Sequence, residues 1–239
     1  GTELALNGTA VHAVVHILYK ALLLMTMGAV LFRTGTCKAT ELGGLYKSMP
    51  WTTTFCVVGA AASAAFPLFS GFISKSLIMS AIGKEQHWFV WGMLVFAAAG
   101  VVFHSGLKVP YFAFFAHDSG KRVKEAPWNM LLAMGLTAFL CIFIGVYPQA
   151  LYDILPFPVD YVPYTTAHVI TQLQLLMFSA LAFTVLMLYK IYPPELKSTN
   201  LDTDWFYRKL LPCVLGWVGN VIRKIDRTIR EEAYETRLA

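Results

Sequence analysis

Charged residues are scarce in this sequence. Only 14% of its 239 residues are Asp, Glu, Lys or Arg, while 57% are hydrophobic. A soluble domain usually has about 25% charged and 45–50% apolar residues, so this composition excludes an ordinary soluble domain. The formal net charge of +5 does not indicate a nucleic-acid partner, because the basic residues lie in loops and at the C-terminal end, where they set membrane topology.

Paired cysteine motifs are also absent. The four cysteines have no CxxC or similar spacing, which argues against a disulfide framework or a zinc site. Cys56 and Cys141 lie in apolar runs, where cysteine packs as a small hydrophobic residue. We expect no metal, no redox cofactor and no catalytic centre in this chain. No signal peptide is recognisable and the sequence starts with Gly1, so we expect either a processed chain or a piece of a longer one.

What the sequence has instead is long apolar runs. A hydrocarbon core about 30 Å thick requires roughly 20 apolar helical residues. Five segments meet that length, at about 10–32, 51–82, 88–107, 128–151 and 168–192. Tryptophans cluster where segments begin, as in the aromatic belt of membrane proteins. The expected fold class is therefore all-α integral membrane, with about five transmembrane helices.

Basic residues alternate between the two sides of this predicted bundle. The loops after the first and third segments, and the tail after the fifth, are rich in Lys and Arg, whereas the other two loops are not. Because basic loops stay in the cytoplasm, the N-terminus is predicted outside and the C-terminus inside. We expect a multi-pass protein of a bacterial or archaeal cytoplasmic (inner) membrane.

The second segment is too long for one straight crossing. Its 32 residues would extend about 48 Å as a helix, at 1.5 Å per residue. Pro67 removes a backbone donor and Gly71 permits an open turn, which predicts a discontinuous helix. Broken helices at membrane depth often mark ion sites. The alternative is a purely structural loop between two tilted half-helices.

Ionisable residues inside these apolar runs are costly, by about 2.5–3.5 kcal/mol each on insertion scales. His12, His16 and Lys20 are spaced i, i+4, i+8 and so share one helix face. Lys75 follows the predicted break. Histidine titrates near neutral pH, so the stripe is suited to proton relay. The alternatives are a packed core histidine and, for Lys75, a lysine that extends to the membrane surface.

Two further ionisable residues, His104 and Lys108, end the third segment one turn apart. They are candidates for an exit path, or else a packed helix end and a positive-inside anchor. His168 opens the fifth segment and is interpreted as an interface residue.

The sequence changes character after residue 192, which divides a transmembrane domain (1–192) from a cytoplasmic-side tail (193–239). Residues 210–238 predict an amphipathic helix that lies on the membrane or on a partner; a solvated tail is the alternative. Its apolar face comprises Leu215, Val218, Ile222, Ile225 and Ile229, opposite Arg223, Lys224, Arg227, Arg230 and Glu231.

Three sequence blocks carry a resemblance to a known family. They are HxxxHxxxKALLL at 12–24, GGLxxSMP at 43–50 and FPLFSGFISK at 66–75. In order and spacing they resemble the second half of the antiporter-like proton-conducting subunits of respiratory complex I, membrane-bound hydrogenases and Mrp-type sodium/proton antiporters. The resemblance covers roughly residues 1–190.

The resemblance implies a fold and a set of functional residues. The family fold has two inverted five-helix repeats, each with a broken helix; here the first two segments match its eleventh and discontinuous twelfth helices. Its relay histidines and lysine fall on His12, His16 and Lys20, and its broken-helix charge falls on Lys75. The first repeat is not in this sequence, so another polypeptide or the rest of a longer chain is expected to supply it.

Together these observations predict an ion-translocating subunit, for protons or sodium ions, of a multi-subunit respiratory or antiporter complex in the lipid bilayer. The predicted relay residues are His12, His16, Lys20, Lys75, His104 and Lys108. One alternative is a structural membrane subunit without transport. Another is a b-type haem protein, which an i, i+4 histidine pair on one helix disfavours because haem needs histidines that face each other from different helices.

Overall fold

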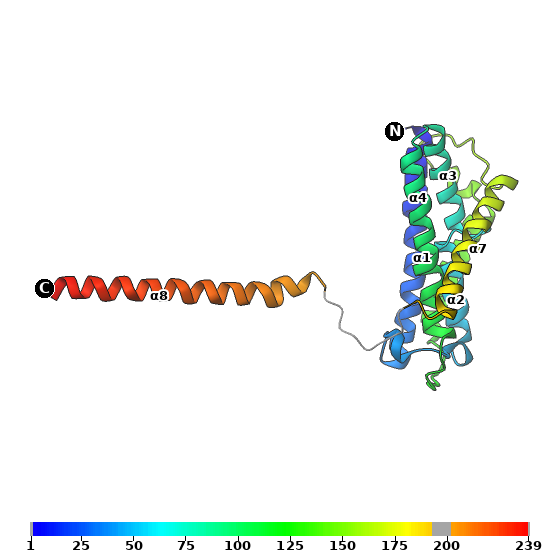
Figure 1. The fold of residues 1–239 in the computed structure, drawn as a ribbon. Helices are drawn as coiled ribbons and strands as arrows, with labels where there is room; N and C mark the ends of the chain where they lie inside the picture. The colour runs from blue at the N-terminus through cyan, green and yellow to red at the C-terminus, as the bar shows by residue number, and fades with distance from the viewer. Residues whose placement is uncertain (1, 193–201, 239) are drawn as a thin grey trace. The chain divides into compact units, whose positions relative to one another are not determined.

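The computed structural model describes residues 2–192 and 202–238, and it is helical throughout the described elements. The chain divides into two compact units, residues 1–195 and 196–239. Figure 1 shows the first unit as a bundle of long helices. Residues 193–201, where the predicted tail begins, lie outside the described residues.

Four helices of the first unit are long and apolar enough to cross a membrane: α1 (Glu3–Thr34), α4 with its continuation (Trp88–Phe115), α5 (Trp128–Val146) and α7 (Thr166–Leu188). Large apolar side chains such as Phe89 and Phe96 are exposed on this bundle, as expected of helix faces that contact lipid. The predicted all-α membrane fold is confirmed.

The remaining predicted crossing is divided into two short helices, α2 (Pro50–Ser63) and α3 (Ser70–Lys84). In the connection, Ala65 and Leu68 have φ values of 60° and 74°, a left-handed conformation that costs about 1–2 kcal/mol for a residue with a Cβ. A Cβ on Gly71 would overlap the carbonyl oxygen of Ala62, so glycine is required for the two half-helices to meet. The predicted discontinuous helix is therefore confirmed.

The third and fourth predicted segments differ from the structure in their lengths. Helix α4 (Trp88–Val101) continues as π-helical turns, η3 (Val102–Lys108) and η4 (Tyr111–Phe115), and passes the predicted end at residue 107. Helix α5 stops at Val146 before Pro148, and a short helix α6 (Gln149–Tyr152) follows. The sequence had predicted one continuous segment that ends at residue 151. Proline causes this stop, since it has no amide hydrogen for the helix.

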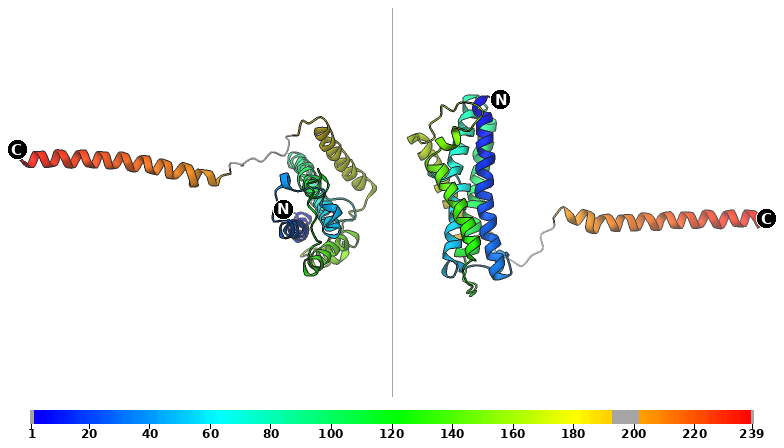
Figure 2. Two further views of the ribbon diagram at one scale, coloured as in Figure 1. Left: turned by 90° about the horizontal axis from the view of Figure 1, so that it is seen from below. Right: turned by 180° about the vertical axis from the view of Figure 1, so that it is seen from behind.

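The connections group at two ends of the bundle (Figures 1 and 2). Asn7 donates to the Phe157 carbonyl over 2.8 Å, which ties the start of α1 to the segment between α6 and α7; we call this end the N-terminal side. The loop with η1 (Ala39–Glu41) and η2 (Leu45–Lys47) meets the loop after η4 at the other end, where Ser119 Oγ donates to the Gly43 carbonyl over 3.0 Å. We call that end the basic-loop side.

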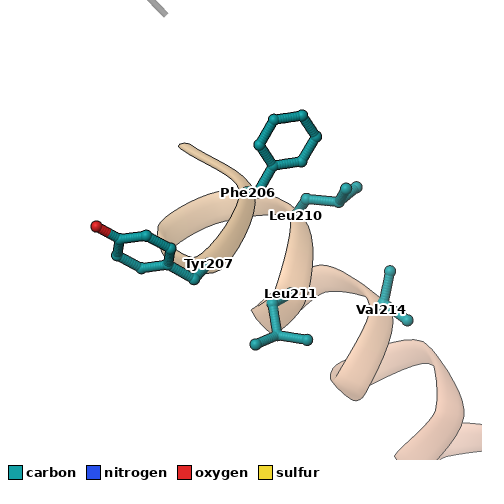
Figure 3. A pocket seen from close by; sticks show the side chains of 5 residues that line it. All are labelled: Phe206, Tyr207, Leu210, Leu211 and Val214. Atoms are coloured by element: carbon teal, nitrogen blue, oxygen red, sulfur yellow. The ribbon is translucent and has the colours of Figure 1, made fainter. Parts of the chain in front are cut away.

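The C-terminal unit consists of a π-helical turn, η5 (Phe206–Leu210), and α8 (Leu211–Leu238). Its predicted apolar residues, from Leu215 to Ile229, are all exposed within this unit. A small open hollow near its start is lined by Phe206, Tyr207, Leu210, Leu211 and Val214 (Figure 3). The predicted amphipathic helix is thus confirmed as a helix. Glu231 was predicted on its polar face, and the side chain of this residue lies outside the part of the chain that the structure describes.

Replacement of Gly71 by alanine should prevent the two half-helices from packing. The added Cβ meets backbone rather than a flexible side chain, and overpacking of this kind costs about 1–3 kcal/mol or more. We expect a lower yield and a lower melting temperature of the membrane domain in detergent. Gly28→Ala is the control, because nothing lies within 4 Å of a Cβ added there; equal behaviour of the two variants would contradict this account.

Candidate functional site

The histidines of α1 reach the broken helix from one face of α1. The rings of His12 and His16 lie edge to face with centroids 5.5 Å apart. His12 Nδ1 is 3.1 Å from the Ser74 hydroxyl of α3, and His16 Nδ1 is 3.3 Å from the buried Tyr19 hydroxyl. The predicted shared face is therefore present, and it connects α1 to α3.

Lys20 ends this stripe against the third crossing. Its ammonium group donates to the Ser105 hydroxyl over 3.2 Å. Ser105 is only 7% exposed and belongs to the π-helical turn η3. Single π-helical turns inside α-helices are frequent at functional sites, and here the turn presents a hydroxyl group to the lysine.

Lys75 lies at the break in the second crossing. Its ammonium group donates to the Ser63 carbonyl over 2.8 Å. Ser63 is the last residue of α2, and the last carbonyls of a helix have no partner within it and carry partial negative charge. The break thus supplies an acceptor that an intact helix would not have. The Ser63 hydroxyl is buried, with no hydrogen-bond partner among the described residues.

Four of the six predicted relay residues therefore gather between α1, the broken helix and η3. His12 contacts the hydroxyl of Ser74, the residue directly before Lys75, and Lys20 reaches Ser105 of η3. The connecting groups are hydroxyls of Tyr19, Ser74 and Ser105. These hydroxyls were not predicted from the sequence, because a single hydroxyl residue within an apolar helix gives no periodic signal.

The other two predicted residues have different surroundings. His104 is exposed on η3, and the Lys108 ammonium group lies 5.5 Å from the centre of the Tyr192 ring, a distance typical of cation–π attraction. The structure gives neither residue a hydrogen bond to the stripe among the described contacts.

Two acidic residues of the loop after η4 secure the basic-loop side. The Asp118 carboxylate accepts from Arg122 at 2.7 Å and from Lys47 at 2.9 Å. These hydrogen bonds, with Arg122 foremost, hold the pKa of Asp118 well below its usual value. Glu125 accepts from the Trp51 amide at 2.8 Å and the Thr52 hydroxyl at 2.6 Å, so a residue far along the chain caps the N-terminus of α2.

Comparison with known proteins gives matches over this same region. Residues 1–100 match the family described as NADH:quinone oxidoreductase/Mrp antiporter, transmembrane. The chain is 31% identical over 160 residues to a Na(+)/H(+) antiporter subunit of Alkalihalophilus pseudofirmus, which is 62% of this chain and 20% of that protein. It is 31% identical over 142 residues to NADH-ubiquinone oxidoreductase chain 5 of Metridium senile, which is 56% of this chain and 23% of that protein.

Two further similarities extend these findings. Hydrogenase-4 component B of Escherichia coli is 29% identical over 157 residues, which is 61% of this chain and 23% of that protein. A solved chain of the membrane-bound sulfane sulfur reductase, an archaeal respiratory membrane complex, matches in fold with a TM-score of 0.60 and 23% identity, over 98% of this chain and 44% of that chain. The matches to the three curated relatives span only about a fifth of each relative's length.

Loss of the Glu125 carboxylate should destabilise the broken helix. Removal of a helix N-cap costs about 0.5–2 kcal/mol, and Glu125→Ala removes the acceptor for both Trp51 and Thr52. We expect a lower melting temperature in detergent than for Glu85→Ala, which replaces an exposed glutamate after α3. If both variants melt together, the carboxylate does not cap α2 in solution.

Proposed function

Since residues 1–100 belong to the NADH:quinone oxidoreductase/Mrp antiporter transmembrane family, we propose that this chain is an ion-translocating part of a multi-subunit membrane complex. It moves protons, or exchanges them for sodium ions, and the energy comes from redox chemistry in partner subunits or from an ion gradient. Two antiporter and respiratory relatives, named above, support this assignment. Its partners include other membrane subunits of that complex.

The observation that carries the proposal is the hydrogen bond from the Lys75 ammonium group to the Ser63 carbonyl at the helix break. An ionisable group at membrane depth is costly and usually serves ion movement. Here it lies where backbone acceptors are freed by the interruption, next to Ser74, which contacts His12 of α1.

The histidines connect these two lysines in the proposed path. His12 contacts Ser74 on α3, and His16 contacts Tyr19 on α1. Each imidazole can accept a proton on one nitrogen and release one from the other. Water is the natural link between neighbouring members, because the hydroxyls of Ser74, Tyr19 and Ser105 offer both donors and acceptors.

His104 and Lys108 are retained as candidate relay residues toward the basic-loop side. They flank Ser105 on the same π-helical turn, and Ser105 accepts from Lys20. In this arrangement a partner subunit covers the exposed His104.

The orientation and the tail complete the proposal. The basic-loop side carries Lys47, Lys121, Arg122 and Lys124, so the positive-inside rule places it in the cytoplasm of a bacterial or archaeal cell and the N-terminal side outside. The tail then starts on the cytoplasmic side, and α8 lies along the membrane surface or a partner subunit.

Substitution of either central lysine should stop ion movement. We expect Lys75→Gln and Lys20→Gln to lower formation of a pH gradient, or sodium uptake, at least tenfold in proteoliposomes of the assembled parent complex, a change equivalent to about 1.4 kcal/mol. The glutamine keeps an N–H donor for the Ser63 carbonyl or the Ser105 hydroxyl, but it cannot carry a proton.

The matched control is Lys84→Gln, which replaces an exposed lysine at the end of the same α3 helix and should translocate at the wild-type rate. Full-rate translocation by both central variants would show that this region is scaffold and that the conducting path lies in another subunit.

A further inference from the structure

A histidine and a tyrosine meet at the N-terminal side of the bundle, away from the residues discussed above. The Tyr161 hydroxyl, in the segment between α6 and α7, is 3.1 Å from Nδ1 of His168 in the first turn of α7. Their ring centroids are 6.0 Å apart, and both side chains are partly buried. His168 was predicted only as an interface residue, and nothing in the sequence pairs it with Tyr161.

The pair also contacts the broken helix. The Tyr161 hydroxyl lies near the side chains of Ser76 and Ser80 on α3, and the Ser76 hydroxyl donates to the Ile73 carbonyl over 3.0 Å. Ser76 and Ser80 are spaced i, i+4 and thus form a serine stripe along one face of α3. This stripe starts at the residue after Lys75 and ends at the N-terminal side of the bundle.

The imidazole of His168 is not needed to begin α7. Thr165 already caps this helix, because its hydroxyl accepts from the His168 amide over 3.3 Å. The segment from α6 to the start of α7 also carries Asp153, Asp160, Tyr152 and Tyr164. Tyr164 donates to the Gly145 carbonyl, and the Tyr152 hydroxyl is buried without a described partner. Among the side chains of this segment, only the imidazole can take up a proton at one ring nitrogen and release a proton from the other.

We propose that Tyr161 and His168 form the outer opening of the ion path and pass protons between the serine stripe of α3 and water on the N-terminal side. This inference deepens the function proposed above and rests on it. It adds two proton-transferring residues beyond the lysine and histidine stripe of α1 and α3.

The transfer leaves each hydroxyl unchanged. Ser80 gives its hydroxyl proton to the Tyr161 oxygen and receives another proton from further along the α3 part of the path. Tyr161 in turn gives its own hydroxyl proton to Nδ1 of His168. The imidazolium that forms releases the proton on Nε2 to outside water. The imidazole is then neutral again, with its remaining proton on Nδ1 instead of Nε2. The original tautomer returns when the ring rotates or when a proton passes in the opposite direction.

The test uses the assembled complex in proteoliposomes with three variants. His168→Asn keeps a hydrogen-bonding group near Nδ1 but cannot carry a proton, and Tyr161→Phe removes the hydroxyl. We expect both to slow formation of the pH gradient roughly three- to tenfold per assembled complex. The matched control is His87→Asn, at an exposed histidine directly before α4 on the same side, and it should keep the full rate.

A rescue experiment separates proton transfer from structural support. His168→Ala should also be slow, and imidazole added on the N-terminal side should restore part of the lost rate. Imidazole should not restore Lys75→Gln. The proposal is overturned if His168→Asn and Tyr161→Phe pump at the full rate, or if they reduce only the amount of assembled complex. If those variants are normal while Lys75→Gln is inactive, only this inference fails; if Lys75→Gln is also normal, the proposed function fails with it.

Discussion

Every backbone polar group inside a membrane must find its partner within the protein, and the break between α2 and α3 is where this requirement is hardest to meet. The freed carbonyls are satisfied from other elements. Gln172 of α7 donates to the Ala64 carbonyl over 3.1 Å, and Lys75 donates to the Ser63 carbonyl over 2.8 Å. Gly145 of α5 allows the connection to approach, because a Cβ there would overlap the Leu68 carbonyl. Helices α5 and α7 are thus positioned by the break.

The same constraint explains how a charge-carrying residue can also support the fold. A lysine that loses its proton becomes a neutral amine, which still has two N–H donors for the Ser63 carbonyl. The acceptor at the end of α2 therefore remains satisfied in both states, and the break need not open when the proton leaves. An arginine would keep its charge, and a methionine could not donate. This requirement for a donor in both protonation states favours lysine at position 75.

Much of this arrangement could be predicted from the sequence because it depends on local patterns. The apolar runs predicted the crossings, Pro67 and Gly71 predicted the break, and the i, i+4, i+8 spacing predicted the stripe on α1. The contacts of the site depend instead on how separate helices align. Lys20 meets Ser105, which is 85 residues away, and Trp51 meets Glu125, which is 74 residues away. No local pattern specifies such pairs, because a shift of one helix by one turn would change them. The π-helical turn that exposes Ser105 to Lys20 likewise gives no signal in an apolar run.

The two ends of the bundle differ in how they respond to protons. On the basic-loop side, Asp118 is held by Arg122 and Lys47, and its pKa lies well below the usual value. A depressed carboxyl pKa contributes stability above the unfolded-state pKa and loses it only as the pH falls through the folded-state pKa, so these exposed contacts remain charged throughout the physiological range. Their contribution is modest because solvent screens them, but it does not vary with the protons that the path carries. On the N-terminal side the corresponding contact is between a phenol and an imidazole, whose two ring nitrogens can take up and release a proton. The Glu125 cap on α2 and the Asp118 contacts can therefore hold the broken helix fixed on the basic-loop side. Changes in protonation are then confined to the lysines, the histidines and the opening on the N-terminal side.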